Sequence, residues 1–196
     1  MSKQTEFIAK HKDGVIKASY GTGIFPSVKM AQMILESGWG ESANARLANN
    51  YFGIKKGVGW TGETITLSTP NDAKKTNEFR KYKTSADSVA DHTSFLQKNK
   101  RYENAGVFKA KTPEEQIQSI AKAGYAEAGD YVPKVLSVIK SNNLKQLDEE
   151  AKKYKPEDTK PSDDRTDAKG IIVATIGVVA LYILYIKLTK EKWIQI

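Results

Sequence analysis

The feature that most constrains this chain is a short apolar helix that the sequence predicts over residues 26–37. Pro26 suits the first turn of a helix, where its missing N–H costs no hydrogen bond. Apolar residues then recur at helical spacing, and Gly38 is a natural helix end. The helix therefore ends on one carboxylate, Glu36, which is followed closely by the indole of Trp39. A carboxyl group in such a place suits the cleavage of sugar chains.

Glu36 is placed where a carboxyl group tends to keep its proton. The last turn of a helix carries the negative end of the helix macrodipole, which disfavours a further negative charge. Burial against Trp39 and the nearby methionines would raise the pKa of Glu36 further. A carboxylic acid that stays protonated near neutral pH can donate its proton to a glycosidic oxygen. The alternative from residue type alone is an ordinary solvated glutamate on a helix surface.

Several segments together resemble one enzyme family. They are PSVKMAQMILESGWGES, NNYFGIK, GETITL, FRKYKTSADSVADHTSFL and AGYAEAGDYVPKVLSVI, in that order along the chain. They closely resemble the peptidoglycan glucosaminidases of bacteria and phages, glycoside hydrolase family 73, over about residues 5–147. The resemblance implies a lysozyme-like fold and cleavage of the β-1,4 bond after N-acetylglucosamine. It also implies that Glu36 is the general acid.

The same resemblance implies a set of substrate-binding residues. They are Trp39, Asn50, Tyr51, Phe52, Gly53 and Tyr125.

The sequence departs from the family at the expected second carboxylate. Members of the family commonly carry another Glu in a β-hairpin, where this chain has Thr69-Pro70-Asn71. Asp72 is the nearest replacement and the second catalytic candidate, and Glu63 is the next. The alternative for Asp72 is a turn residue, as its Pro-Asn-Asp context suggests. Asn71 and Glu63 are further candidates for orienting a water molecule or the substrate.

Composition excludes several kinds of chemistry. The chain has no cysteine and only two histidines, which are far apart, so no metal site and no cofactor are expected. His92 is interpreted as an ordinary helix residue. The net charge of +8 would attract polyanions. Because no nucleic-acid-binding motif is present, peptidoglycan is the expected anionic partner and no nucleic acid is expected.

The predicted fold class is α+β: a mostly helical lysozyme-like domain with one β-hairpin, plus a C-terminal single transmembrane helix. An N-terminal helix within residues 2–20 is expected to be interrupted near Gly14. A hairpin is expected within residues 60–82, where polar and apolar residues alternate. Further helices are expected at residues 26–37, 85–98, 113–123 and 131–141.

Four segments are expected along the chain. They are the catalytic domain (1–147), a charged flexible linker (148–169), a transmembrane helix (170–188) and a short basic tail (189–196). The transmembrane helix is predicted from an uncharged apolar run that is long enough to cross a bilayer with little tilt. The N-terminus has no apolar stretch typical of a cleavable signal peptide. The expected location is therefore a membrane, either of a bacterial envelope or of a membrane-containing virion.

Three functions compete at this stage. The first is an endo-β-N-acetylglucosaminidase with Glu36 as its general acid, and a phage lytic protein is one setting for such an enzyme. The second is a lytic transglycosylase, in which a hydroxyl of the sugar attacks and one carboxylate suffices. The third is a membrane-anchored wall-binding or virion protein without turnover.

Overall fold

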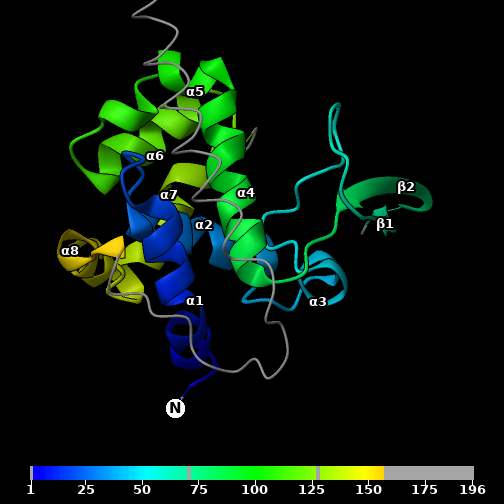
Figure 1. The fold of residues 1–196 in the computed structure, drawn as a ribbon, viewed down its shortest axis with the longest axis horizontal. Helices are drawn as coiled ribbons and strands as arrows, with labels where there is room; N and C mark the ends of the chain where they lie inside the picture. Colours follow the sequence, from blue (N-terminus) through cyan, green and yellow to red (C-terminus); the bar gives the residue numbers. More distant parts are fainter. Residues whose placement is uncertain (1, 70–71, 127–128, 157–196) are drawn as a thin grey trace, which may run out of the picture. The chain divides into compact units, whose positions relative to one another are not determined.

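The computed structural model describes residues 2–69, 72–126 and 129–156, which belong to one compact unit (Figure 1). Its helices are α1 (Lys3–Ser19), α2 (Pro26–Ser37), α3 (Ala43–Ala48), α4 (Ser85–Lys98), α5 (Lys100–Asn104), α6 (Pro113–Lys122), α7 (Tyr131–Ser141) and α8 (Lys145–Lys153). A 3-10 turn, η1, spans Val107–Lys109. The strands β1 (Thr64–Thr69) and β2 (Asp72–Arg80) complete the described structure.

Helix α2 lies at the centre of the helical part. Every residue from Pro26 to Ile34 is buried, and the helix packs against α1, α6, α7 and α8. It begins at Pro26 and is closed by Gly38, whose φ of 56° is a left-handed conformation that favours glycine. The predicted bounds of this helix are confirmed. The consequence is that Glu36, in its last turn, is carried by the most buried element of the fold.

The predicted interruption of the first helix is wrong. Helix α1 continues through Gly14 from Lys3 to Ser19. A Cβ atom built at Gly14 would lie 3.7 Å from the Cβ of Ala86 at the start of α4. Gly14 therefore sits at a close approach of α1 and α4, which pack along one another, and it does not mark a break in the helix.

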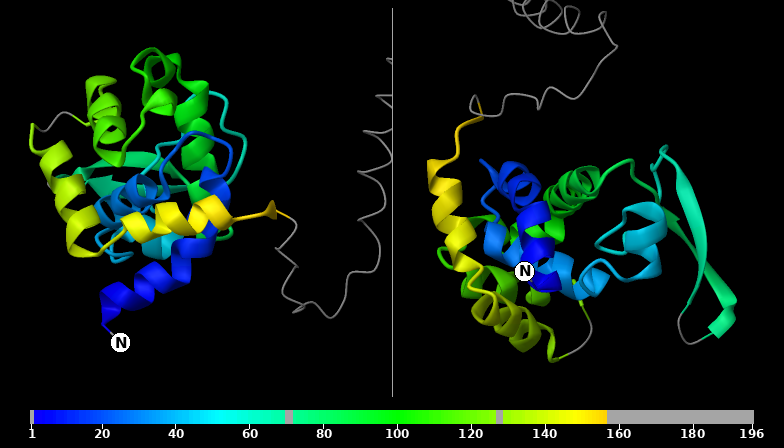
Figure 2. Two further views of the ribbon diagram at one scale, coloured as in Figure 1. Left: turned by 90° about the vertical axis from the view of Figure 1, so that its left-hand side faces the viewer. Right: turned by 90° about the horizontal axis from the view of Figure 1, so that it is seen from below.

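The β-hairpin projects away from the main group of helices, as the right view of Figure 2 shows. Strands β1 and β2 pair antiparallel, and Thr69 pairs with Asp72 next to the turn. The register shifts between Ser68 and Thr69, because Ser68 pairs with Thr76. Among the helices, α3 packs against both strands. The predicted hairpin within residues 60–82 is confirmed.

The helical domain continues beyond the predicted boundary at residue 147. Helix α8 spans Lys145–Lys153 and packs against α1 and α2. Its residue Leu147 is buried, and Asp148 accepts hydrogen bonds from Ser27 at the start of α2. The first residues of the predicted linker are therefore a docked helix.

The predicted fold class is wrong in its C-terminal part. Over the described ranges, which end at residue 156, no helix is both long enough and apolar enough to cross a membrane. The predicted span at residues 170–188 lies outside the described residues, as do the tail and most of the linker. The fold class is thus corrected to a mostly helical, lysozyme-like α+β domain with one two-stranded sheet.

Candidate active site

Glu36 is open to solvent and still has a raised pKa. Glu36 is exposed to solvent, whereas most residues of α2 before it are buried. Desolvation by the surrounding protein raises the pKa of its carboxyl group above the usual value. These two observations describe a carboxyl group that water reaches from one side only. Such a group can meet a large substrate and still hold a proton to give to it.

Two tyrosine side chains lie within range of the charge of Glu36. The rings of Tyr125 and Tyr131 are stacked, with 5.7 Å between their centroids and 26° between their planes. Desolvation raises the pKa of both phenols, and the charge of Glu36 raises the pKa of each further. Both hydroxyl groups therefore keep their protons at ordinary pH and can act as hydrogen-bond donors beside the carboxyl group.

Trp39 lines a groove between α1 and the segment 141–150, and Glu36 is not among the residues that line this groove. Its ring contacts Phe7 edge-on at 5.7 Å, and its side chain is partly exposed. The groove has a volume of about 850 Å³ and is also lined by the amides of Asn142 and Asn143. An indole combined with side-chain amides can stack on a sugar ring and hydrogen-bond its substituents.

The segment 50–53 lies behind this site and is held by its own contacts. Asn50 is fully buried, and its amide accepts from the backbone of Ile54 and donates to Ile54 and Arg80. Tyr51 and Phe52 are buried in the aromatic core. Gly53 is partly exposed and has a φ of 60°. In this structure the three side chains of residues 50–52 serve packing, and their burial leaves them little contact with solvent.

Glu63 is the hairpin candidate whose side chain the structure describes. Glu63 is exposed at the start of the hairpin and forms an ion pair with Lys81 at 3.1 Å. Asp72 is the first residue of β2, next to the turn, and Asn71 lies outside the described residues. Within the described residues, no hydrogen bond or ion pair connects Glu36 to the hairpin. The structure therefore brings Tyr125 within range of the charge of Glu36, three residues before Trp39, and pairs Glu63 with Lys81 at the base of the hairpin.

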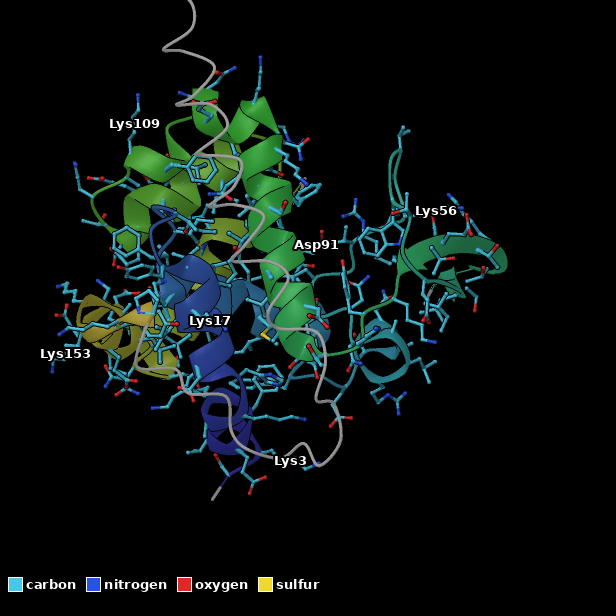
Figure 3. The ribbon with its side chains drawn as sticks, viewed as in Figure 1. Lys3, Lys17, Lys56, Asp91, Lys109 and Lys153 are labelled. Atoms are coloured by element: carbon cyan, nitrogen blue, oxygen red, sulfur yellow. The ribbon has the colours of Figure 1, made fainter. Side chains whose placement is uncertain are left out.

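An ion pair fixes the base of the hairpin to the helical part. Arg80 Nη1 donates to Asp91 Oδ2 at 2.7 Å, and the hydroxyl of Tyr82 donates to the same oxygen at 2.7 Å. Asp91 lies on the side of α4 that faces the hairpin (Figure 3). Since Asn50 bonds the carbonyl of Arg80, this contact also ties the hairpin to the segment 50–53.

Several polar residues near the site were not predicted from the sequence. Gln32 Nε2 donates to the hydroxyl of Tyr131 at 2.8 Å, and His92 Nε2 lies 3.0 Å from the hydroxyl of Tyr125. Lys29 Nζ lies 2.8 Å from His92 Nδ1. The available signal was the spacing of residues 29, 32 and 36, which places all three on one side of a helix. In the part of the chain that the structure describes, no group of side chains could hold a metal ion.

Comparison with known sequences gives one family and several relatives. The family model described as glucosaminidase, mannosyl-glycoprotein endo-beta-N-acetylglucosaminidase, matches residues 12–144. The peptidoglycan hydrolase FlgJ of Vibrio parahaemolyticus is 38% identical over 140 residues, covering 67% of this chain and 45% of that protein. The exo-glucosaminidase LytG of Bacillus subtilis is 32% identical over 136 residues, covering 64% of this chain and 47% of that protein. The chain thus spans less than half the length of these relatives.

Solved structures give a consistent fold. The catalytic domain of the autolysin Auto from Listeria monocytogenes superposes with a TM-score of 0.64 and 26% identity, over 76% of this chain and 89% of that domain. The glycoside hydrolase domain of FlgJ from Salmonella typhimurium superposes with a TM-score of 0.61 and 30% identity, over 78% of this chain and 94% of that domain.

Proposed function

The chain belongs to the glucosaminidase family, glycoside hydrolase family 73, and from this premise we propose that it cleaves β-1,4 bonds in peptidoglycan glycan strands with Glu36 as general acid. One observation carries the assignment of Glu36 most directly. Its carboxyl group is open to solvent, has a raised pKa and lies within range to act on the phenols of Tyr125 and Tyr131 through its charge. The relatives named peptidoglycan hydrolase and exo-glucosaminidase support the class of substrate.

The chemistry follows from the protonation of Glu36. A protonated carboxyl group donates to the glycosidic oxygen as the bond to the anomeric carbon breaks, which makes the departing sugar a neutral alcohol. Glu36 is then left as a carboxylate, and the hydroxyl groups of Tyr125 and Tyr131 are the nearby donors that can stabilise it. The indole of Trp39, three residues after Glu36 in the chain, would stack on a neighbouring sugar.

The second reacting group decides between hydrolysis and transglycosylation. An inverting hydrolase needs a base that activates water across the sugar from the acid, and Asp72 and Glu63 are the candidates. The carboxylate of Glu63 is already paired with Lys81 at 3.1 Å, which competes with a role as the base. This observation favours, as a second candidate function, a lytic transglycosylase in which a hydroxyl of the substrate attacks instead of water.

The first experiment tests the acid. Purified peptidoglycan is digested with the wild type, with Glu36→Gln and with Glu41→Gln, and clearing is followed by turbidity and zymography. We expect Glu36→Gln to lose roughly 10²–10⁴-fold in rate, the usual loss for a missing general acid. Glu41 is an exposed glutamate five residues later, and its variant should clear at the wild-type rate. Wild-type clearing by folded Glu36→Gln would refute the assignment, and a wild type without clearing would favour a wall-binding protein.

Mass spectrometry of the products separates the two reactions. A glucosaminidase leaves reducing N-acetylglucosamine ends, which borohydride converts to the alcohol, whereas a transglycosylase leaves anhydromuramyl ends that borohydride does not reduce. We expect reducing N-acetylglucosamine. The same products show whether single sugars or longer fragments are released, which distinguishes exo from endo cleavage. Asp72→Asn and Glu63→Gln are then compared, and a loss below about tenfold in both would mean that no second protein carboxylate is required.

A further inference from the structure

A lysine and a histidine meet in the interior directly behind the site. Lys29 on α2 and His92 on α4 are both fully buried. Lys29 Nζ lies 2.8 Å from His92 Nδ1, and its ammonium group lies 5.7 Å from the ring centre of Phe52. No carboxylate forms an ion pair with Lys29 among the residues that the structure describes. A buried lysine without a counter-ion costs stability, so its retention calls for a physical reason.

The histidine continues the contact toward Glu36. His92 Nε2 lies 3.0 Å from the hydroxyl oxygen of Tyr125. Phe52 stacks on the imidazole at 3.9 Å with 3° between the two planes, which fixes the plane of the ring. Tyr125 in turn lies close enough to Glu36 for the carboxylate charge to raise the pKa of its phenol. Hydrogen-bond contacts therefore run from Lys29 through His92 to Tyr125, and the phenol of Tyr125 lies within range of the charge of Glu36.

The donors and acceptors of this chain set its direction. While Lys29 carries its proton, its ammonium group has three N–H donors and no acceptor, so it donates to His92 Nδ1. Burial lowers the pKa of His92, and the charge of Lys29 lowers it further, so the imidazole is neutral and carries its one proton on Nε2. That N–H donates to the oxygen of Tyr125. The proton of the Tyr125 hydroxyl group is then free to point away from His92, and Glu36 is a carboxyl group whose charge acts on this phenol.

We propose that Lys29 and His92 are positioning residues, which together turn the hydroxyl proton of Tyr125 toward Glu36. The catalytic consequence rests on the proposed function, because Tyr125 would stabilise the carboxylate that Glu36 becomes after it gives up its proton. The orientation itself does not depend on activity. Without Lys29, Nδ1 loses its donor, the imidazole proton can move to Nδ1, and Tyr125 can then donate to Nε2 instead of to Glu36.

Other ionisable groups face this chain and would contribute to its pH dependence. Tyr131 on α7 and Tyr102 on α5 both interact with Tyr125, and Tyr102 accepts a hydrogen bond from Arg101 at 2.6 Å. Burial lowers the pKa of Lys29 well below its usual range, so the amine can lose its proton as the pH rises. A neutral amine also accepts hydrogen bonds, and the direction of the chain is then no longer fixed.

The orientation is tested by nitrogen-15 NMR of the two imidazoles in the full chain. The protein has only two histidines, and the other, His11, has a pKa lowered to about 4 by burial, so both rings are neutral at pH 7. We expect the wild type to carry the His92 proton on Nε2 alone and Lys29→Met to show both tautomers. Lys17→Met is the matched control, because Lys17 is exposed on α1, and it should leave the His92 spectrum unchanged (Figure 3). A wild-type proton on Nδ1, or no change in Lys29→Met, overturns the proposal whether or not the protein is active.

The catalytic consequence is tested by the pH dependence of the cleavage rate. Loss of a donor to the carboxylate raises the pKa of Glu36. Because the acid must be protonated, the alkaline limb of the rate profile should move to higher pH in Lys29→Met, with a fall of about tenfold in the maximal rate. Lys29→Met should have no further effect in a Tyr125→Phe background, because the hydroxyl group that Lys29 and His92 orient is then absent. Additive losses would mean that Lys29 acts only on the fold.

Two substitutions of His92 separate positioning from packing. His92→Gln keeps one acceptor for Lys29 and one donor for Tyr125, so it should retain the wild-type position of the alkaline limb. His92→Leu removes both groups and should shift the limb in the same direction as Lys29→Met. If the Gln and Leu variants, both confirmed as folded by circular dichroism, shift the limb equally, the hydrogen-bond chain is not what positions Tyr125.

Discussion

At the scale of single residues, the proposed acid Glu36 is positioned at some cost to the stability of the fold. The carboxyl group sits in the last turn of a buried helix and is partly desolvated, so its ionised form is less stable in the folded protein than in the unfolded chain. An unfolded glutamate has a pKa near 4.3, and the folded pKa lies above that value. The folded state therefore binds this proton more tightly, and the stability linked to Glu36 is lost as the pH rises through the folded pKa.

We predict that Glu36→Gln makes the protein inactive but more stable near neutral pH. The amide has a similar shape and carries no charge, so it removes the penalty for ionisation. The difference in melting temperature between variant and wild type should be near zero at about pH 4, where both side chains are neutral, and should grow toward pH 8. Calorimetry across this range measures it, with Glu41→Gln as the control for loss of a charge. A variant less stable than the wild type at every pH would contradict the prediction.

The role of Glu36 could be proposed from the sequence because its signals are local. Gly38 closes the helix and the motif around Glu36 is continuous, so few assumptions place the carboxyl group. His92 shows the opposite case. Its helix was predicted, but its partners Lys29 and Tyr125 lie 63 and 33 residues away in the chain. No periodicity within α4 reveals such partners, and a histidine near a helix face was therefore interpreted as an ordinary one.

At the scale of elements, helix ends were predicted well and helix contacts were not. Helix α4 begins with a capping box, in which Thr84 and Asp87 each satisfy a backbone N–H of the other, and α6 begins at Thr112-Pro113. These signals lie within four residues of each helix start. Gly14 led to a wrong prediction of a helix break, because glycine disfavours a helix in isolation but also permits two helices to approach closely. Only the position of α4 decides between these meanings.

We predict that Gly14→Ala stabilises the protein by about 0.5–1 kcal/mol, because alanine has the higher helix propensity. The added methyl group would meet Ala86 at 3.7 Å, an ordinary van der Waals contact. Gly14→Leu should instead destabilise the protein by about 1–3 kcal/mol, since the longer side chain must push α1 and α4 apart. Denaturant unfolding measures both. Equal destabilisation by the two variants would show that the helices already touch at this point.

At the scale of the whole domain, α8 is the element that composition alone hid. The segment Lys145–Lys153 is rich in charged residues and was assigned in large part to a linker. In the structure it lies across α1 and α2, and Asp148 supplies the N-terminal cap that α2 lacks, because the residue at the cap position is Phe25. Backbone N–H and Oγ of Ser27 donate to Asp148 at 2.8 and 2.7 Å. The docked helix therefore supports one end of α2, and Glu36 occupies the other.

We predict that Asp148→Ala destabilises the full chain by about 1–3 kcal/mol. Ser27 is fully buried, so loss of the carboxylate leaves its N–H and hydroxyl without an acceptor. The matched control is Glu149→Ala, which removes the neighbouring carboxylate. Glu149 forms only an exposed pair with Lys152 on the same helix, so its loss should cost less than about 0.5 kcal/mol. Urea unfolding followed by circular dichroism measures both variants. Because the cap acts on stability and not on the reaction, the cleavage rate per folded molecule should be unchanged in Asp148→Ala. If the two variants unfold at the same urea concentration, α8 does not cap α2, and the helix that carries Glu36 is held by its apolar contacts alone.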